Sequence, residues 1–484
     1  MAKIVTMCLI FCTTLRAETI NVPADHSLIQ DAITASANGD TILVAPGVYV
    51  ENINFRGKNI VLASEFLFDR NPGTIVATVI NGGTPVHPDT GSCVIINSGE
   101  DSSAVLEGFT LTGGIGTRWI DEHGAGTYTE GGGILIQYSS PTIRHNRIVG
   151  NTAIRVVSGI LSAGGGGIRI GDGTPKILNN VIMDNEGLYG GGIVLNYTGG
   201  TVRNNIIANN RVYQAAGNAP TFGGGGIWIS SNFGTNQKVV ENNTIYGNSV
   251  TGSTGGGFSG RGGGILVGGT TVVVRNNIVW NNTQVTGGQI GVAGGGNPIV
   301  SFSDVQNGYA GEGNIDVDPI LSDTSFYLSP GSLCIDAGDS SVTMNDPEDP
   351  MNAGSALWPA AGVLRNDMGA YGGPGSAQLG SFPITSVDGP GSGSPVPLTF
   401  SLLQNYPNPF NPSTTFEFQL AGTDVVTLVI FDMLGRPVGT LVNEILPAGT
   451  HTREWNAAGL PSGVYFARLM TGSAVETRRL MLLR

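Results

Sequence analysis

Residues 131–151 read GGGILIQYSSPTIRHNRIVGN, and this pattern returns four more times before residue 300. Each copy opens with a glycine cluster and an isoleucine. Each then contains a short apolar strand between two turn asparagines, as in HNRIVGN, NNVIMDN, NNIIANN, NNTIYGN and NNIVWNN. A weaker sixth copy begins at Gln289-Ile290. The chain is therefore a repeat protein, and the repeat decides its fold.

The spacing of the copies shows where the repeat tolerates insertions. The opening isoleucines are 34, 25, 34, 38 and 25 residues apart, at Ile134, Ile168, Ile193, Ile227, Ile265 and Ile290. The basic unit therefore has about 25 residues. Nearly all the extra residues lie between the second turn asparagine of one copy and the isoleucine of the next. Insertions are thus expected at one corner of the unit.

A unit this short, rich in β-branched residues and without a helical pattern, has no room for a crossover helix. We therefore expect each copy to form one turn of a parallel β-helix, with strands stacked about 4.8 Å apart. Three aligned aliphatic columns fit inward-facing stacks. One column is formed by the opening isoleucines, and the other two are Ile143, Ile177, Val202, Val240, Val274 and Ile148, Ile182, Ile207, Ile245, Val279.

A fourth column consists of asparagines at a corner, where left-handed φ and amide bonds along the axis are expected. Its members are Asn146, Asn180, Asn205, Asn243 and Asn277. The glycines before each isoleucine would allow the tight bend that closes a coil. These features resemble right-handed parallel β-helix proteins of the pectin-lyase-like type, and the right hand is implied by that resemblance and by the crossover rule.

The beginning of the chain predicts export and a capped β-helix. Residues 1–17, with Lys3, an apolar run and Ala17, are typical of a secretory signal peptide. No other run reaches the ~18 apolar residues of a membrane span, so no transmembrane segment is expected in the mature chain. After a strand at TINVP, Ser27 is expected to be the N-cap of an amphipathic helix that covers the open end of the core. Its apolar face would be Leu28, Ile29, Ala32 and Ile33.

The two cysteines of the mature chain, Cys93 and Cys334, are separated by several coils. At about 4.8 Å per coil they lie beyond disulfide reach, so two buried thiols are expected.

After Val300 the repeat gives way to NIDVDPIL, FYLSPGSLCIDAGD and NDMGAYGG. These segments resemble the terminal segment of bacterial surface β-helix proteins, so residues 18–373 are interpreted as one β-helix with caps at both ends. Residues 374–398, rich in Gly, Ser and Pro, read as a flexible linker.

Residues 399–484 contain alternating strands separated by turns, which predicts a small antiparallel β-sandwich. The order QNYPNPFNP, MLGRPV and WNAAGLPSGVYFARL is very similar to the type A sorting domain of type IX secretion cargo. That resemblance implies recognition by the type IX secretion machinery and passage across the outer membrane. It also implies anchoring at the cell surface or release. The fold class is thus all-β, a right-handed parallel β-helix with an N-terminal capping helix followed by a β-sandwich.

Candidate catalytic groups are few. β-Helix enzymes that cut acidic polysaccharides need carboxylates gathered on neighbouring coils. Residues 131–300 contain only Asp172, Asp184, Glu186 and Glu241, in no obvious cluster. This scarcity favours a protein that is not an enzyme. The opposing signal is Trp119-Ile120-Asp121-Glu122-His123, which resembles the WIDH motif of pectate lyases with one residue inserted. A lyase site at Asp121, Glu122 and His123 is weighed against a solvated loop.

Two further sets of residues have alternative interpretations. Aspartates of the C-terminal cap could hold calcium or could simply form an acidic cap: Asp336, Asp339, Asp346 and Asp349. Outward-facing Arg144, Arg203, Glu241 and Arg275 align in a ladder, which we interpret as a row of surface ion pairs rather than a binding site.

The corner insertions precede the same strand in each coil, so they should form a wall beside its outward face. Aromatic and polar residues there suit a sugar, namely Trp228, Arg169, Tyr213, Trp119, Phe222 and Phe258. The same aromatic rings could instead pack the loops down. Alternation along the strand turns Trp228 outward, because it follows the inward Ile227.

The charge distribution sets the final expectations. Residues 131–300 carry ten Lys and Arg against four acidic residues, while the rest of the chain has 13 against 32. A basic centre favours an anionic glycan, and nucleic acid is not expected for an acidic exported chain. The sequence predicts a secreted or surface protein, non-catalytic, that binds polysaccharide or has a structural or adhesive role. The alternative is a polysaccharide lyase or glycoside hydrolase with its site in the loop wall. No cofactor other than calcium is considered.

Overall fold

The computed structural model describes residues 17–121, 123–154, 157–213, 222–251, 259–322, 325–376 and most of 401–483. Residues 403–404, 406–407, 409, 421–423, 434, 447–448 and 472–474 are outside the described set, as is the predicted signal peptide except for Ala17. The chain divides into two compact units, Met1–Ile320 with Leu328–Gly380, and Leu321–Tyr327 with Ser381–Arg484.

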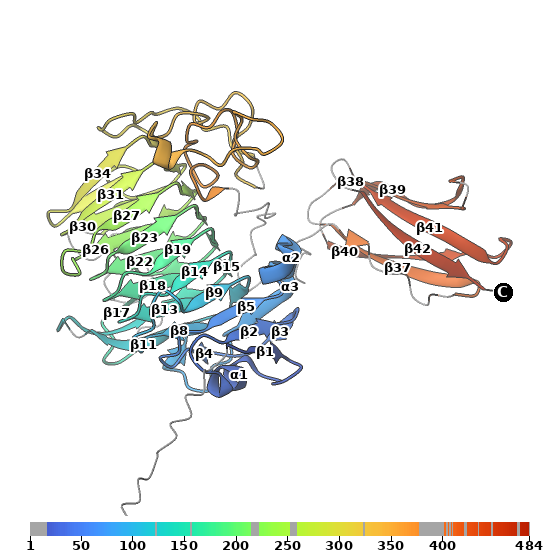
Figure 1. The fold of residues 1–484 in the computed structure, drawn as a ribbon, viewed down its shortest axis with the longest axis horizontal. Coiled ribbons are helices and arrows are strands. Elements are labelled where there is room, and N and C mark those ends of the chain that lie inside the picture. The colour runs from blue at the N-terminus through green and yellow to red at the C-terminus, as the bar shows by residue number, and fades with distance from the viewer. Residues whose placement is uncertain are drawn as a thin grey trace, which may run out of the picture. The chain divides into compact units, whose positions relative to one another are not determined.

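Three long parallel sheets form the first unit, and successive strands of each sheet come from successive coils (Figure 1). Sheet I consists of β1 (Thr19–Val22), β2 (Thr41–Val44), β5 (Val61–Ser64), β9 (Val105–Glu107), β14 (Thr142–Arg144), β19 (Lys176–Leu178), β23 (Gly200–Arg203), β27 (Lys238–Glu241), β31 (Thr271–Arg275) and β34 (Asn297–Ser301). Sheet II consists of β3 (Gly47–Tyr49), β6 (Thr78–Asn81), β10 (Thr110–Thr112), β15 (Arg147–Val149), β20 (Val181–Met183), β24 (Ile206–Ala208), β28 (Thr244–Tyr246), β32 (Ile278–Trp280) and β35 (Asp304–Val305).

Sheet III carries the outward positions predicted for ligand binding. It consists of β4 (Ile53–Asn54), β8 (Val94–Ile96), β13 (Ile134–Gln137), β18 (Ile168–Gly171), β22 (Ile193–Asn196), β26 (Ile227–Ser230), β30 (Ile265–Gly268) and β33 (Ile290–Ala293). A short parallel sheet at the corner after sheet II contains β16 (Thr152–Ala153), β21 (Glu186–Gly187), β25 (Arg211–Val212) and β29 (Ser249–Val250). The insertions add a sheet of β7 (Thr90–Gly91), β11 (Gly116–Asp121), β12 (Gly126–Glu130) and β17 (Ser162–Gly164).

The three aliphatic columns pair in the predicted register. Ile134 aligns with Ile168 in sheet III, Ile143 with Ile177 in sheet I, and Ile148 with Ile182 in sheet II. The remaining members continue the same columns through the following coils. All of them belong to one buried core. The predicted parallel β-helix is therefore confirmed, coil by coil.

Two asparagine ladders run along the axis beside this core. In the predicted column, each amide donates to the Oδ1 of the next asparagine at 3.0–3.2 Å, from Asn146 to Asn277. A second ladder with the same bonds, at 2.9–3.0 Å, runs from Asn151 to Asn282. The expectation of left-handed φ for the first column was wrong by one residue. The positive φ belongs to the preceding residue, as at Asn179 (55°) and Asn204 (54°), which frees the ladder amide to point inward.

The N-terminal end of the core is covered as predicted, but the helix is capped by another residue. Helix α1 (Ile29–Ala35) buries Ile29, Ala32 and Ile33, while Leu28 is 46 % exposed. Ser27 is not the N-cap, because the helix starts later and its first two N–H groups donate to the Glu51 carboxylate at 2.9 and 3.0 Å. A carboxylate from the next coil thus satisfies the helix terminus. Two short helices follow, α2 (Phe66–Asp69) and α3 (Pro72–Ala77).

The C-terminal segment folds back along the β-helix. After η2 (Val342–Met344), residues 366–376 run beside the left-handed asparagines. Asn242 donates to Asp367 O, Asn204 donates to Ala370 O and Gly372 O, and Asn179 donates to Gly375 O, at 2.7–3.1 Å. This return strap, residues 366–376, therefore spans several coils. It ends at the buried Ser376, within the stretch that the sequence assigned to the linker.

The second unit contains two antiparallel sheets around one core. One sheet is β36 (Ser401–Leu402), β37 (Ser413–Leu420) and β40 (Gly449–Asn456). The other is β39 (Pro437–Leu446), β38 (Asp424–Phe431), β41 (Gly463–Met470) and β42 (Val475–Leu482). The two sheets share a core that includes Phe416, Leu428, Trp455 and Leu480. The antiparallel C-terminal domain is confirmed.

Candidate functional site

The outward face of sheet III is largely covered by the insertions that precede its strands. Leu135, Val194 and Leu266 are at most 1 % exposed, and Arg169 is 2 % exposed. Strand β12 of the hairpin β11–β12 pairs with β17 from the next insertion, which extends this cover. Where the structure describes them, the insertions of the predicted wall therefore lie over the strands as well as beside them.

Part of this wall consists of aromatic rings that pack on one another. Trp228 points outward from β26 as predicted, but its ring centroid lies 5.4 Å from that of Tyr189. Tyr189 also contacts Phe222 at 5.7 Å and Tyr128 at 6.4 Å. This geometry favours the packing alternative for Trp228 and Phe222. Tyr213 is 42 % exposed under the Arg211 guanidinium, and Phe258 lies outside the described residues.

Arg169 forms a buried ion pair beneath the wall. Its Nε lies 2.8 Å from Oε2 of Glu130, and the other oxygen of Glu130 accepts the hydroxyl of Tyr189 at 2.5 Å. Burial and the charge of Glu130 raise the pKa of Tyr189 well above its usual value. Breaking such a buried pair typically costs 3–5 kcal/mol. Arg169 therefore has a structural partner, although its Nη1 has none.

The hairpin β11–β12 carries Trp119 and His123, and it places both rings over the corner where the strands of sheet III end. The Trp119 ring lies 5.8 Å from that of Tyr138, and the Arg169 guanidinium lies 5.4 Å from the Trp119 ring. Further along the corner, His123 stacks on Tyr197 with a centroid distance of 3.6 Å and an interplanar angle of 15°. Two aromatic pairs thus stand side by side along the axis.

A polar chain links these two pairs. His123 Nε2 lies 3.0 Å from Oδ1 of Asp172, whose other oxygen accepts a hydrogen bond from Gln137 Nε2 at 2.6 Å. The His123 side chain is 38 % exposed and that of Asp172 is 10 % exposed. The carboxylate fixes one imidazole nitrogen, so the other is available at the rim.

The backbone at this corner is strained. Tyr138, Asp172 and Tyr197 have φ of 53°, 45° and 49° and occupy the same register in three successive coils. Glycine takes the equivalent place at Gly269. A left-handed conformation costs an L residue roughly 1–2 kcal/mol, and such strain collects at functional sites. Bulky tyrosines at two left-handed positions therefore mark this corner as a candidate for function.

Several buried polar atoms converge at the same place without a partner. They are Nε1 of Trp119, Oε1 of Gln137 and Nη1 of Arg169. A side chain at Gly171 would exclude this arrangement, because its Cβ would lie 2.2 Å from Arg169 Nη1 and 2.3 Å from Gln137 Oε1. Burying a polar group without a partner costs about 1–3 kcal/mol. We define the corner site as Trp119, His123, Gln137, Tyr138, Arg169, Asp172 and Tyr197.

The predicted catalytic trio is not assembled as expected. Asp121 is 8 % exposed and accepts the backbone N–H of His123 at 2.7 Å, so its carboxylate shapes the turn. The imidazole of His123 instead pairs with Asp172, from a different coil. Glu122 lies outside the described residues. His123 lies between β11 and β12, and from there its imidazole reaches Asp172, which directly follows β18 of sheet III.

The aspartates of the C-terminal cap mostly accept hydrogen bonds from backbone N–H groups. Asp336 accepts from Val363 at 2.9 Å, and Asp346 accepts from Gly373 at 2.5 Å. Asp349 and Asp339 likewise accept from backbone groups two residues ahead. Burial, followed by the charge of Asp367, raises the pKa of Asp346 to about 8. Within the described ranges no three carboxylate, His or Cys groups are close enough to hold a metal ion, and calcium stays a prediction of the sequence alone.

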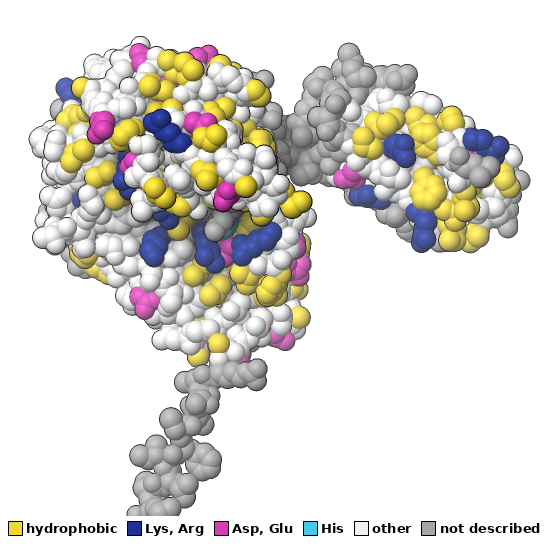
Figure 2. Space-filling model, turned by 45° about the horizontal axis from the view of Figure 1, so that its top comes forward, with side chains coloured by type: hydrophobic (Ala, Val, Ile, Leu, Met, Phe, Trp, Pro, Cys, Tyr) yellow, Lys and Arg dark blue, Asp and Glu magenta, His cyan; other side chains and the backbone are white. Residues whose placement is uncertain are grey.

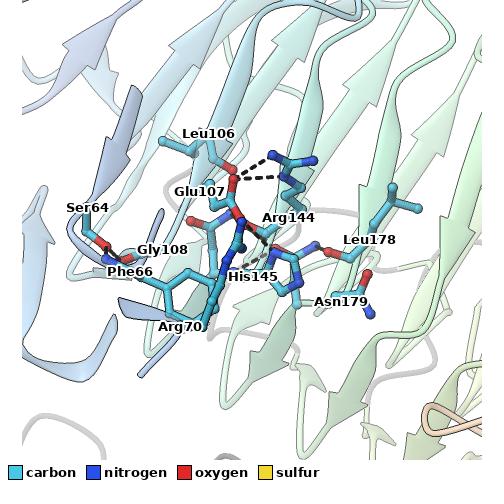
Figure 3. A network of polar contacts seen from close by, with 12 residues as sticks. Ser64, Phe66, Arg70, Leu106, Glu107, Gly108, Arg144, His145, Leu178 and Asn179 are labelled. Carbon is cyan, nitrogen blue, oxygen red and sulfur yellow. Dashed lines mark hydrogen bonds and ion pairs between the residues drawn. The ribbon is translucent and has the colours of Figure 1, made fainter. Parts of the chain in front are cut away.

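The arginine ladder forms two ion networks. Glu241 lies between Arg203 at 3.4 Å and Arg275 at 2.9 Å, as the alignment predicted. Figure 3 shows the second network, in which Glu107 faces Arg70 and Arg144, each at 2.7 Å, and His145 at 3.0 Å. Burial alone would raise the pKa of Glu107, but the hydrogen bond from His145 and the charge of Arg144 outweigh it and lower the pKa to about 2. Each network surrounds a carboxylate with arginines, which supports the structural interpretation, but the carboxylates are buried and not at the surface as predicted.

Sequence reasoning missed part of the site although signals were present. Tyr138, Asp172 and Tyr197 each lie four residues after an opening isoleucine, so the repeat alone could have aligned them. Glu130 was left out because it lies one residue before the first repeat. Tyr189 gave no signal, because its contacts with Tyr128 and Glu130 depend on how the insertion before β13 folds.

Comparisons with known proteins agree with both units. Residues 91–305 match the family described as right handed beta helix region, and residues 404–483 match the secretion system C-terminal sorting domain. No curated protein is similar enough to count as a match. No helix in the described part of the chain is long and apolar enough to cross a membrane.

Solved structures similar to this chain include two pectin methylesterases. One is a mutant in complex with a hexasaccharide, with a TM-score of 0.30 and 12 % identity over 62 % of this chain and 81 % of that chain. The other is pectin methylesterase from Erwinia chrysanthemi, with a TM-score of 0.27 and 13 % identity over the same shares. The stacked parallel sheets and the two family matches give the chain its class. It is an exported right-handed β-helix protein that carries a C-terminal sorting domain of type IX secretion.

Proposed function

We propose that this secreted or surface-displayed protein binds a polysaccharide at the corner site and does not cut it. The observation that carries the proposal is the strained corner, where exposed and half-buried aromatic rings stand beside the partly exposed His123 and Asp172. Strain opposes folding, so a ligand bound at this corner would explain why it is kept.

The chemistry of the corner suits a sugar chain. Aromatic faces pack on the apolar face of a sugar ring, and a few placed polar groups fix its hydroxyls. Tyr138 is 36 % exposed and Trp119 next to it is half-buried, as is Tyr197 further along the corner. His123 and Asp172 supply hydrogen-bonding groups at the rim.

The repeat itself favours an extended ligand. Tyr138 and Tyr197 lie two coils apart, or about 10 Å along the axis at the usual strand spacing. Two aromatic pairs at this separation can hold two sugars of one chain. A polymer laid along the axis would therefore gain affinity from both contacts.

A glycan array with the full mature chain, followed by titration of the hits, tests this proposal. Tyr197→Ala and Trp119→Ala should weaken binding by about tenfold or more, since each removes a stacking face. Trp280→Ala is the matched control, because Trp280 is a half-buried tryptophan on sheet II and outside the corner site. Equal binding by all three variants would refute the assignment.

A second candidate is cleavage of the bound polysaccharide by a lyase or hydrolase reaction. The observation in its favour is His123, a partly exposed imidazole fixed by Asp172 at 3.0 Å. A base held in this way can remove a proton from a substrate. Assays for new reducing ends and for unsaturated sugar ends on the array hits decide between binding and cleavage. Activity that is lost in His123→Gln would establish the enzyme.

A further inference from the structure

Two adjacent hollows open on the C-terminal unit, on either side of the turn between β38 and β39. One is about 360 Å³ and is lined by Phe431, Asp432, Met433, Gly435, Phe466, Arg468 and Thr477. The other is about 350 Å³ and is lined by Asp432, Met433, Arg436, Val438, Leu460, Pro461, Ser462, Gly463, Val464 and Tyr465. Asp432 and Met433 are common to both, so the turn forms the ridge between them.

The hollows bring together segments that lie far apart in the sequence. The motif MLGRPV contributes the turn, and the motif WNAAGLPSGVYFARL contributes the opposite walls. These are two of the three motifs by which the domain resembles sorting domains. Phe466 of the second motif pairs directly with Phe431, the last residue of β38 and two residues before the first motif, so the two motifs are held close to each other. The motifs thus define one surface rather than two separate ones.

The chemistry of this surface suits a protein partner. Met433 is 72 % exposed on the ridge, and exposed methionines adapt to apolar side chains of a partner. The Arg468 guanidinium is held 5.2 Å from the Phe431 ring, and Arg436 is fixed by Asp432 at 2.7 Å. Figure 2 shows apolar side chains beside Lys and Arg side chains on the surface of this unit. Ordered arginines next to apolar hollows are typical of binding hot spots.

We propose that the turn face, defined as Met433, Phe431, Phe466, Arg468 and Arg436, is where a protein of the secretion machinery docks. The partner would place apolar side chains in the two hollows and a carboxylate against Arg468. The machinery is the expected occupant because the region matched as a sorting domain, residues 404–483, contains both hollows entirely.

The test uses the full chain in a bacterium that has a type IX secretion system. Met433→Asp and Arg468→Glu should lower the surface-displayed fraction about tenfold or more, with accumulation in the periplasm. Val475→Asp is the control, because Val475 is 61 % exposed and lines neither hollow. Met433→Leu should retain display. Thermal unfolding and protease resistance of the purified variants establish whether the domain is folded. If the Met433→Asp chain does not fold, the display of the Arg468→Glu chain decides the outcome.

Three outcomes would overturn the proposal. The first is normal display of a folded Arg468→Glu or Met433→Asp chain. The second is an equal loss with Val475→Asp, which would mean that export depends on the whole domain surface. The third is a dimer in solution that these substitutions dissociate, which would assign the face to a second copy of the chain. Glycan binding by the same purified variants should be unchanged, so this test is independent of the corner site.

Discussion

At the scale of single residues, the described structure separates side chains that support the fold from those available for binding. Glu107, Glu130 and Glu241 are buried carboxylates matched by arginines. His123, Tyr138 and Tyr197 lie instead at a solvent-facing corner. The distinction follows from burial, because a buried charge must be paired whereas a partly exposed ring can exchange water for a ligand.

Glu107→Gln tests the buried network. The folded pKa of Glu107 is lowered to about 2 from 4.5, so its contribution to stability is complete above pH 4.5 and is lost as the pH falls towards 2. The shift corresponds to roughly 3 kcal/mol. We expect Glu107→Gln to reduce the free energy of unfolding by about that amount at pH 7. The free energy of unfolding should then also depend less on pH below 4.5. Denaturant unfolding between pH 2.5 and 7 measures both.

Glu186→Gln is the control for that experiment. Glu186 pairs at 2.5 Å with Arg211, whose side chain is 50 % exposed. Exposed pairs contribute under about 1 kcal/mol, so little change is expected at any pH. An equal loss of stability in both variants would contradict the special role of Glu107.

Trp228 and Tyr213, which the sequence placed together as one sugar platform, should now behave differently. Trp228→Ala removes a ring packed on Tyr189 and should lower stability by about 3 kcal/mol, because a large cavity is left. Tyr213→Ala removes an exposed ring and should be close to neutral. Calorimetry of the two single variants checks this, and a stable Trp228→Ala chain with lost glycan binding would restore the platform.

At the scale of elements, the repeat predicted what depends on register and missed what depends on tertiary contacts. Ile193 and Ile207 align with their columns because inward positions recur at a fixed place in each coil. The cap of α1 could not be predicted, since Glu51 comes from a later segment. The position of His123 was unpredictable for the same reason, as it depends on how a hairpin folds across three coils.

The asparagine ladder gives a prediction at this scale. Asn205 is fully buried, accepts two hydrogen bonds from Asn180 and donates to Ile177 O, Arg203 O and Asn243 Oδ1. Asn205→Ala would leave several of these groups unpaired, at about 1–3 kcal/mol each. We expect a loss of at least about 3 kcal/mol by denaturant unfolding. The exposed Asn236→Ala should change stability by under about 0.5 kcal/mol, and similar values for both would argue against the ladder.

At the scale of the whole molecule, the two units have separate tasks. The β-helix unit has its own core and caps, and the C-terminal unit has its own core. Removal of residues 401–484 should therefore leave a folded β-helix that stays in the periplasm of a type IX host. Fractionation and circular dichroism measure the two outcomes, and surface display of the truncated chain would show that export does not need the domain.

The central claim is that the strained corner of sheet III binds a polysaccharide. Calorimetric titration of the best array hit into the full mature chain and into Tyr138→Ala/Tyr197→Ala tests it most directly. Both tyrosines directly follow a strand of sheet III and lie outside the buried core, so their replacement leaves the aliphatic columns intact. We predict at least a hundredfold loss of affinity, or about 2.7 kcal/mol, with an unchanged melting temperature. Wild-type affinity in the double variant would contradict the claim.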